Sequence, residues 1–415
     1  MKELNEKHQE EKKDNIELIK QNSNKLIINK NNKKIDSFEI ISKEDEFIDD
    51  YGFTDLSFKN IYENNPLFKH IISHLTEYLY KMPDNPDKNT IEVLSNFISY
   101  DEFTEEIINK ILINGIPESL PCLRPIIWKS LIGFFPLKDL SKWEKVSIKK
   151  QSDYKKLIEK YNYYPNNIKE ENDIHILDQI DKDLPRTRFD CPFFNEKNQN
   201  NKNENNYDVL RRILFFYSIE HEDVAYIQGM NEIIAIIFYI FSKDDNQFSK
   251  EYIESDSYYT FEKLMHEIKH VFMLDDLTYS QLFVTLQIKE IKRILKNAEP
   301  ELFNHFDEIN LVLDNIVMRW ILVLFAQEFT LDLAVNFWDR LFTQKDKLKF
   351  ICYISASIIK IHKKELMTMD SGDIMEWAQQ LQKKMNEEDI NNIVKVALQL
   401  QNVYYKKDSN NICVK

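Results

Sequence analysis

Apolar residues recur at helical spacing in nearly every segment between about residues 112 and 405. In the segment "YDVLRRILFFYSIE", Val209, Leu210, Ile213 and Leu214 fall on one face of a helix. The segment "NEIIAIIFYIF" is apolar on all sides, which is typical of a buried helix. Strict alternation of apolar and polar residues, which marks a half-buried strand, is hard to find. The sequence therefore predicts an all-α fold.

The composition changes along the chain and divides it into segments. Lys, Asn and Glu dominate the first 45 residues, so this part has too little apolar surface to offset the entropy lost on ordering. We expect a disordered polar tail over 1–45, a helical lead-in over 46–111 and a helical domain over 112–350. We expect further helices over 351–405 to complete that domain, before a short tail at 406–415.

The chain carries a formal net charge of −14, which makes it a poor electrostatic match for nucleic acid or anionic lipid. Its 4 cysteines lie far apart, which argues against a disulfide framework or a Cys-rich zinc site and indicates a reducing compartment. The longest apolar run, "IIAIIFYIF", is much shorter than the roughly twenty residues of a membrane-spanning helix. We therefore expect a cytoplasmic protein with no nucleic-acid partner and no direct membrane insertion, which contacts membranes through another protein.

Glycine is scarce, with 5 in 415 residues and no two close together. A phosphate-binding loop and a dinucleotide-binding fingerprint both need closely spaced glycines, so that the backbone can approach phosphate. Neither motif is present. If the protein acts on a nucleotide, it does so with side chains.

The segment "HEIKH" matches the HExxH pattern of zinc peptidases, with His266, His270 and a third candidate ligand at Glu290. The apolar residues around it form the opposite face of the predicted helix, so both histidines are expected to project toward solvent. A catalytic zinc needs ligands that point into a cleft and are held by further hydrogen bonds. An exposed helical face is the favoured interpretation and we expect no metal; a zinc peptidase is the weaker alternative.

Two of the chain's 8 arginines lie in the segment "IDKDLPRTRF", although lysine outnumbers arginine 47 to 8. Pro185 is expected to end the preceding helix and to place Arg186 on a short stiff loop, within reach of Asp183. A pre-positioned guanidinium can neutralise charge on a transferring phosphoryl group. The alternative is a structural Arg–Asp pair. Arg188 lies two residues further on, and we expect it to tolerate lysine.

Gln228 stands immediately before the apolar helix, next to Gly229. A glutamine side chain can hydrogen-bond a water molecule and a carbonyl at the same time, as is needed to orient an attacking water. Gly229 would let the backbone come close to a partner. The alternative is an ordinary helix start, capped by Gly229 or Asn231.

Together these motifs resemble the TBC domain of Rab GTPase-activating proteins over about residues 112–350. Two motifs of that family are IxxDxxRT and YxQG, which are matched here by Ile180, Asp183, Arg186, Thr187, Tyr226, Gln228 and Gly229. The "GIP…LRxxxW" opening and the later tryptophan motifs are matched by Gly115, Ile116, Pro117, Arg124, Trp128, Trp320, Phe329, Trp338 and Asp339. The block at 212–233 is similar to that of the member-thirteen subgroup of the TBC domain family.

The resemblance implies a domain of two helical subdomains that activates a Rab-family small GTPase in vesicle trafficking and intracellular protein transport. Arg186 would be an arginine finger and Gln228 a glutamine finger, both supplied in trans. The GTP and Mg²⁺ would be bound by the partner GTPase, so that this chain needs no cofactor. The alternative within the same family is a catalytically silent Rab-binding scaffold.

The resemblance also assigns supporting roles. Asp183 would orient Arg186, and Thr187 and Gly229 would support the two loops. Tyr226 would support the glutamine loop and contact the partner. Arg124, Trp128 and Trp338 would hold the fold, with the other residues of their motifs. The Asn-rich insertion at 195–206 departs from the family pattern, and we expect a mobile surface loop that affects which Rab fits.

Overall fold

The structure is a computed structural model of the 415-residue chain. It describes residues 112, 115–117, 123–136, 142–161, 171–198, 201–243, 252–272 and 277–412. All of them belong to the contact unit Asn89–Lys415, while the expected polar tail and helical lead-in lie outside the described residues. Within these ranges the regular structure is helical, and the β pairing consists of one isolated bridge. The all-α prediction is confirmed.

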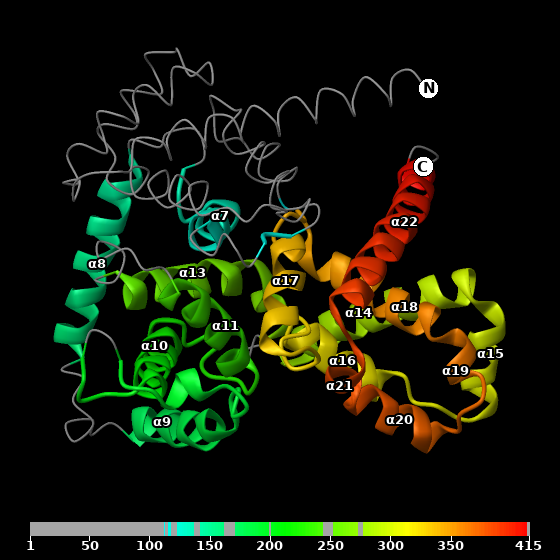
Figure 1. Cartoon of the computed structure of the whole chain (residues 1–415), viewed down its shortest axis with the longest axis horizontal. Helices are drawn as coiled ribbons and strands as arrows, with labels where there is room; N and C mark the ends of the chain where they lie inside the picture. The colour runs from blue at the N-terminus through cyan, green and yellow to red at the C-terminus, as the bar shows by residue number, and fades with distance from the viewer. Residues whose placement is uncertain are drawn as a thin grey trace, which may run out of the picture. The chain divides into compact units, whose positions relative to one another are not determined.

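One group of helices packs around the apolar helix α11 (Met230–Ser242), which contacts α10, α13, α17 and α7 (Figure 1). Tyr239 is half-buried, and every other residue of α11 is buried, as its predominantly apolar sequence predicts. The other members of this group are α7 (Leu123–Leu131), α8 (Trp143–Lys160), α9 (Glu171–Asp183), α10 (Asn206–Glu220) and α13 (Ile253–Ile268).

A second group packs around α18 (Lys347–Ile361), which contacts α14, α16 and α22. Helix α17 (Leu331–Leu341) contacts both α11 and α22 and so joins the two groups, which correspond to the two expected subdomains. Helix α22 continues past residue 405, where we expected the helices to end. The remaining helices are α14 (Leu277–Ala298), α15 (Pro300–Glu308), α16 (Asp314–Leu322), α19 (Lys363–Leu366), α20 (Ser371–Gln379), α21 (Leu381–Lys384) and α22 (Glu387–Ile412).

The carboxylate of Asp339 on α17 binds the opening motif of the domain. It is fully buried and accepts hydrogen bonds from the backbone nitrogen of Ile116 (2.9 Å), Nε of Arg124 (3.1 Å) and Nε1 of Trp128 (2.8 Å). Because three donors from one segment converge on one buried charge, α7 is fixed against α17. The structural role expected of Arg124 and Trp128 therefore has a geometric basis.

Gly115 lies directly before Ile116 and has a left-handed backbone, with φ of +79°. A Cβ atom there would lie 2.7 Å from Nη1 of Arg340, closer than real contacts allow. Arg340 in turn donates to the carbonyl of Asn336 (2.7 Å) and to the side chain of Asn391 on α22. Glycine at position 115 therefore leaves room for an arginine that ties α17 to α22.

The turn between α16 and α17 has a strained backbone, because Leu324 and Phe325 have φ values of +49° and +61°. Trp338 supports this turn by donating from Nε1 to the carbonyl of Leu324 (3.0 Å). The buried ring of Trp320 lies 5.2 Å from the ring of Phe325, measured between centroids. Both tryptophan motifs thus stabilise one turn, and this turn supports the candidate site described below.

The Asn-rich segment 195–206 forms a short hairpin in its described residues. Lys197 and Asn205 form an antiparallel bridge, and the backbone nitrogen of Asn198 donates to the carbonyl of Glu204 (2.9 Å). These backbone pairs satisfy groups that a mobile loop would leave to water. The described part of this segment is therefore a hydrogen-bonded hairpin on the surface, whereas we expected a loop without such pairing.

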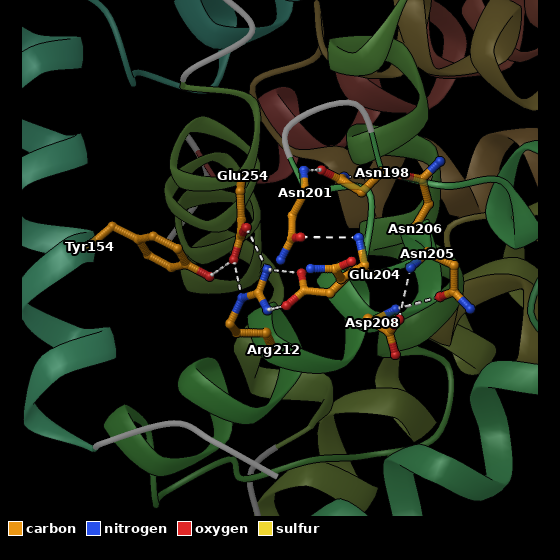
Figure 2. A network of polar contacts seen from close by, with 10 residues as sticks. Tyr154, Asn198, Asn201, Glu204, Asn205, Asn206, Asp208, Arg212 and Glu254 are labelled. Atoms are coloured by element: carbon orange, nitrogen blue, oxygen red, sulfur yellow. Dashed lines mark hydrogen bonds and ion pairs between the residues drawn. The ribbon is translucent and has the colours of Figure 1, made fainter.

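Side-chain contacts attach the hairpin to the helices, as Figure 2 shows. Asn205 and Asp208 form a capping box that starts α10. The guanidinium of Arg212 binds Glu204 of the hairpin (3.1 Å) and Glu254 of α13 (2.6 Å), and Glu254 also accepts from the hydroxyl of Tyr154 (2.8 Å). One arginine therefore joins the insertion to two helices.

Candidate functional site

Arg186 is the last residue of the 3-10 turn Leu184–Arg186, which follows directly on α9. Its side chain is 70% exposed, and its Nη2 atom lies 3.1 Å from Oδ1 of Asp183. Nε and Nη2 also donate to the carbonyl of Lys182, at 3.2 and 3.0 Å. The guanidinium is therefore held against the end of α9 while most of its surface faces solvent.

Asp183 is buried and connects the arginine turn to the glutamine loop. Its second oxygen accepts a hydrogen bond from the hydroxyl of Tyr226 at 2.8 Å. Burial and this hydrogen bond raise the pKa of Tyr226 well above its ordinary value, so the phenol keeps its proton and remains a donor. Tyr226 is 6% exposed, so it supports both loops but offers little surface to a partner, contrary to that part of our expectation.

Asn231 provides a second connection between the same two loops. Its Oδ1 atom accepts from the backbone nitrogen of Gly229 (2.9 Å), and its Nδ2 atom donates to Oγ1 of Thr187 (2.8 Å). The Thr187 hydroxyl donates to the carbonyl of Asp183 (3.0 Å), and the Thr187 carbonyl accepts from Tyr207 (2.7 Å). The backbone on either side of Arg186 and of Gln228 is thus fixed by buried hydrogen bonds.

Gln228 is exposed and directly precedes Gly229, the residue that caps α11. Gly229 is buried and has φ of +109°, a conformation that glycine adopts without steric cost. A Cβ atom there would lie 2.9 Å from Cγ1 of Val323. The chain's own packing therefore favours glycine at this position.

Gly229→Ala is expected to lower the free energy of unfolding by roughly 1–3 kcal/mol, because alanine has to adopt the left-handed backbone and also displace Val323. Urea unfolding measures the change. Gly133→Ala is the matched control, since Gly133 has φ of +78° but no atom within 4 Å of the added Cβ. A loss at Gly229 no larger than that at Gly133 would show that the Val323 contact is unimportant.

Arg188 is buried and attaches the arginine turn to the turn between α16 and α17. Its Nη1 atom donates to the carbonyl of Phe329 (2.9 Å), its Nη2 atom donates to the carbonyl of Ala326, and its Nε atom lies 3.4 Å from the carboxylate of Glu232. Burial raises the pKa of Glu232, while the charge of Arg188 opposes that rise. Lysine has no planar fork to reach two carbonyls, so the tolerance we expected for Arg188→Lys does not fit this environment.

Comparison with known proteins identifies the family. The Rab-GTPase-TBC domain matches residues 121–367, which include both loops and Asp339. The chain belongs to this family. Its fold is that of the Ypt/Rab-GAP domain of Gyp1p, whose crystal structure aligns with a TM-score of 0.64 at 21% identity and covers 80% of this chain and 99% of that one.

Two curated relatives illustrate how far the sequence similarity extends. TBC1 domain family member 13 of Homo sapiens is 33% identical over 169 residues, which are 40% of this chain and 42% of the relative. The GTPase-activating protein GYP1 of Saccharomyces cerevisiae is 25% identical over 253 residues, which are 57% of this chain and 37% of the relative. The chain therefore spans less than half the length of these relatives.

The HEIKH segment of this TBC domain does not form one regular helical face. Helix α13 ends at Ile268, so His270 lies in a following 3-10 turn, while His266 is exposed on α13 itself. Glu290 binds Arg293 through both carboxylate oxygens, at 2.7 Å each. Among the residues that the structure describes, no three His, Cys, Asp or Glu side chains gather as a metal site would require.

Sequence analysis did not predict that Arg188, Asn231 and Glu232 connect the loops of the TBC domain, although Asn231 was considered as a helix cap. A signal for two of them was present, because Asn231 and Glu232 are the polar residues at the start of an otherwise apolar helix. Buried polar side chains need hydrogen-bond partners, so their position predicts a network. No local pattern marks Arg188, since its carbonyl partners are 138 and 141 residues away in the sequence.

The described part of the TBC domain contains no helix that combines the length and the apolar character needed to cross a bilayer.

Proposed function

We propose that this chain is a GTPase-activating protein for a Rab-family small GTPase, with Arg186 and Gln228 entering the nucleotide site of the partner. Membership of the Rab-GTPase-TBC domain family supports this proposal. So do the names of its relatives, since GYP1 is called a GTPase-activating protein and the matching domain of Gyp1p a Ypt/Rab-GAP domain. Such an activity is exercised in the cytoplasm, at membranes that carry the Rab.

The observation that carries the proposal is that Arg186 and Gln228 are both exposed, on loops joined by buried hydrogen bonds. A residue that acts on another protein's substrate has to be exposed, and it acts best when its backbone is already fixed. The bridges through Asp183, Tyr226 and Asn231 meet the second condition for both loops at once.

In this mechanism the fork of Arg186 binds oxygens of the transferring phosphoryl group and neutralises the charge that develops there. Leaving its present contacts with Lys182 and Asp183 costs little, because the Arg186 side chain is 70% exposed and an ion pair made by such a side chain contributes about 0–1 kcal/mol. The Gln228 amide orients the attacking water in place of the glutamine of the GTPase. The GTP and Mg²⁺ belong to the partner, which fits a chain without a glycine-rich phosphate loop.

The test is single-turnover phosphate release from a panel of purified, GTP-loaded Rab proteins with and without this chain. Stimulation by a factor of about 10³ or more for at least one Rab is expected. Binding of the GTP-loaded Rabs without any acceleration would instead make the protein a silent scaffold.

Gln228→Ala is expected to lower the stimulated rate by at least about 10²-fold, because a water displaced by about 1 Å from its reactive position reacts that much more slowly. Gln379→Ala is the matched control, because Gln379 is also exposed but lies at the end of α20. Circular dichroism and thermal unfolding check that both variants fold. Equal rates for the two variants would remove Gln228 from the mechanism.

A further inference from the structure

Phe189 has the most exposed large apolar side chain in the described part of the chain, at 78%. It lies three residues after Arg186, in the turn that links the arginine loop to the 3-10 turn Pro192–Asn195. Single exposed leucines or valines are common on protein surfaces, but a phenylalanine is among the largest apolar groups a chain can leave in water. Its position so close to Arg186 calls for a functional explanation.

The backbone around Phe189 is fixed on both sides. Arg188 precedes it with φ of +45°, and the buried guanidinium of Arg188 is bound by the carbonyls of Ala326 and Phe329. The carbonyl of Arg188 accepts from the backbone nitrogen of Cys191 at 2.8 Å, which closes the turn over Phe189. The Phe189 side chain therefore projects outward from a turn whose backbone is held in place.

Such an arrangement suits a binding anchor. Aromatic residues are enriched among the few side chains that supply most of the affinity of protein interfaces. Fixing an anchor in advance lowers the entropy lost on association. The surroundings supply a polar rim, because Asp190 is exposed and lies 3.5 Å from the side chain of Gln382 on α21.

We propose that Phe189 is an anchor that inserts into an apolar depression on the same GTPase whose nucleotide Arg186 reaches. The inference rests on the proposed function. Arg186 and Phe189 lie three residues apart on one rigid turn. A globular partner that brings its nucleotide to Arg186 therefore also covers the Phe189 side chain. Arg186 then accelerates hydrolysis, while Phe189 supplies affinity and favours GTPases that carry a matching apolar surface.

The test separates binding from turnover. For a responsive Rab, Phe189→Ser is expected to raise the Kd for the Rab loaded with a non-hydrolysable GTP analogue by roughly tenfold to a hundredfold. This corresponds to about 1.4–2.7 kcal/mol at about 1.36 kcal/mol per decade. The maximal rate at saturating protein is expected to stay within about twofold, and Phe189→Leu is expected to recover part of the affinity. Val403→Ser on α22, which removes an apolar side chain that is 53% exposed, is the matched control and is expected to change neither quantity.

Each other outcome overturns the inference in a distinguishable way. If the wild type stimulates a Rab but Phe189→Ser leaves the Kd unchanged, the anchor role of Phe189 is overturned. The proposed function then still stands. If the wild type neither binds nor stimulates any Rab, both proposals are overturned. A wild-type dimer that becomes monomeric in Phe189→Ser would place Phe189 at an interface between two copies. A fall of several degrees in Tm would place it against another part of this chain.

Discussion

Replacing Arg186 with alanine is expected to remove a factor of roughly 10³ to 10⁵ from the stimulated rate of GTP hydrolysis. This corresponds to about 4–7 kcal/mol in the activation free energy, at about 1.36 kcal/mol per decade. The same change is expected to cost at most about 1 kcal/mol of folding stability, because the Arg186 side chain is 70% exposed and the buried Asp183 keeps its hydrogen bond from Tyr226. A large loss of rate with little loss of stability is what separates a finger from a structural arginine.

Two further variants complete this experiment. Arg186→Lys is expected to be poor as well, because an ammonium keeps the charge but lacks the planar fork that spans two oxygens. Lys182→Ala removes an exposed cation from the last turn of α9, where its ammonium binds Asp178, and is expected to stay near the wild-type rate. Near-normal stimulation with Arg186→Ala would contradict the assignment. Arg188 is unsuitable as a control, because it is buried and structural.

Replacing Asp339 with alanine is expected to lower the free energy of unfolding by about 3–5 kcal/mol, because it leaves a buried charge without its partner. Arg124 would lose its carboxylate, and the indole of Trp128 and the backbone nitrogen of Ile116 would lose their acceptor. Urea unfolding measures the change. It is the largest stability effect that we expect from a single substitution in the described part of the domain.

The control for this substitution lies on the same helix. Asp332→Ala removes an exposed carboxylate from the first turn of α17, where a negative charge contributes about 0.3–1 kcal/mol through the helix dipole. A loss at Asp339 no larger than the loss at Asp332 would mean that the opening motif is held by other contacts. Asp339→Asn keeps the size but not the charge and is expected to fall between the two.

Much of the fold could be predicted from the sequence, because helical periodicity is a local property. The segment "NEIIAIIFYIF" predicted a buried helix, and this helix forms the centre of the first group. Pro185 predicted the end of the preceding helix, and α9 ends at Asp183, where the chain continues as the 3-10 turn Leu184–Arg186. The exposed positions of Arg186 and Gln228 also agree with roles that require access to a partner.

The contacts that unite the site could not be predicted in the same way, because they join segments far apart in the sequence. The Asn231–Thr187 bond spans 44 residues, and the contacts of Arg188 span more than a hundred. The prediction for the Asn-rich segment differs from the structure for a related reason. Its composition is typical of a mobile loop, but Glu204 is tied to Arg212 and Asn205 caps α10. Composition does not reveal such partners.

The central claim is that this chain supplies both catalytic groups in trans. The role of Gln228 tests this claim most directly. The deciding measurement is hydrolysis by a responsive Rab whose own water-orienting glutamine has been replaced by leucine. We predict that the wild-type chain still stimulates this Rab and that Gln228→Ala does not. A leucine-substituted Rab that is refractory to the wild-type chain, together with full stimulation of the unmodified Rab by Gln228→Ala, would contradict the claim.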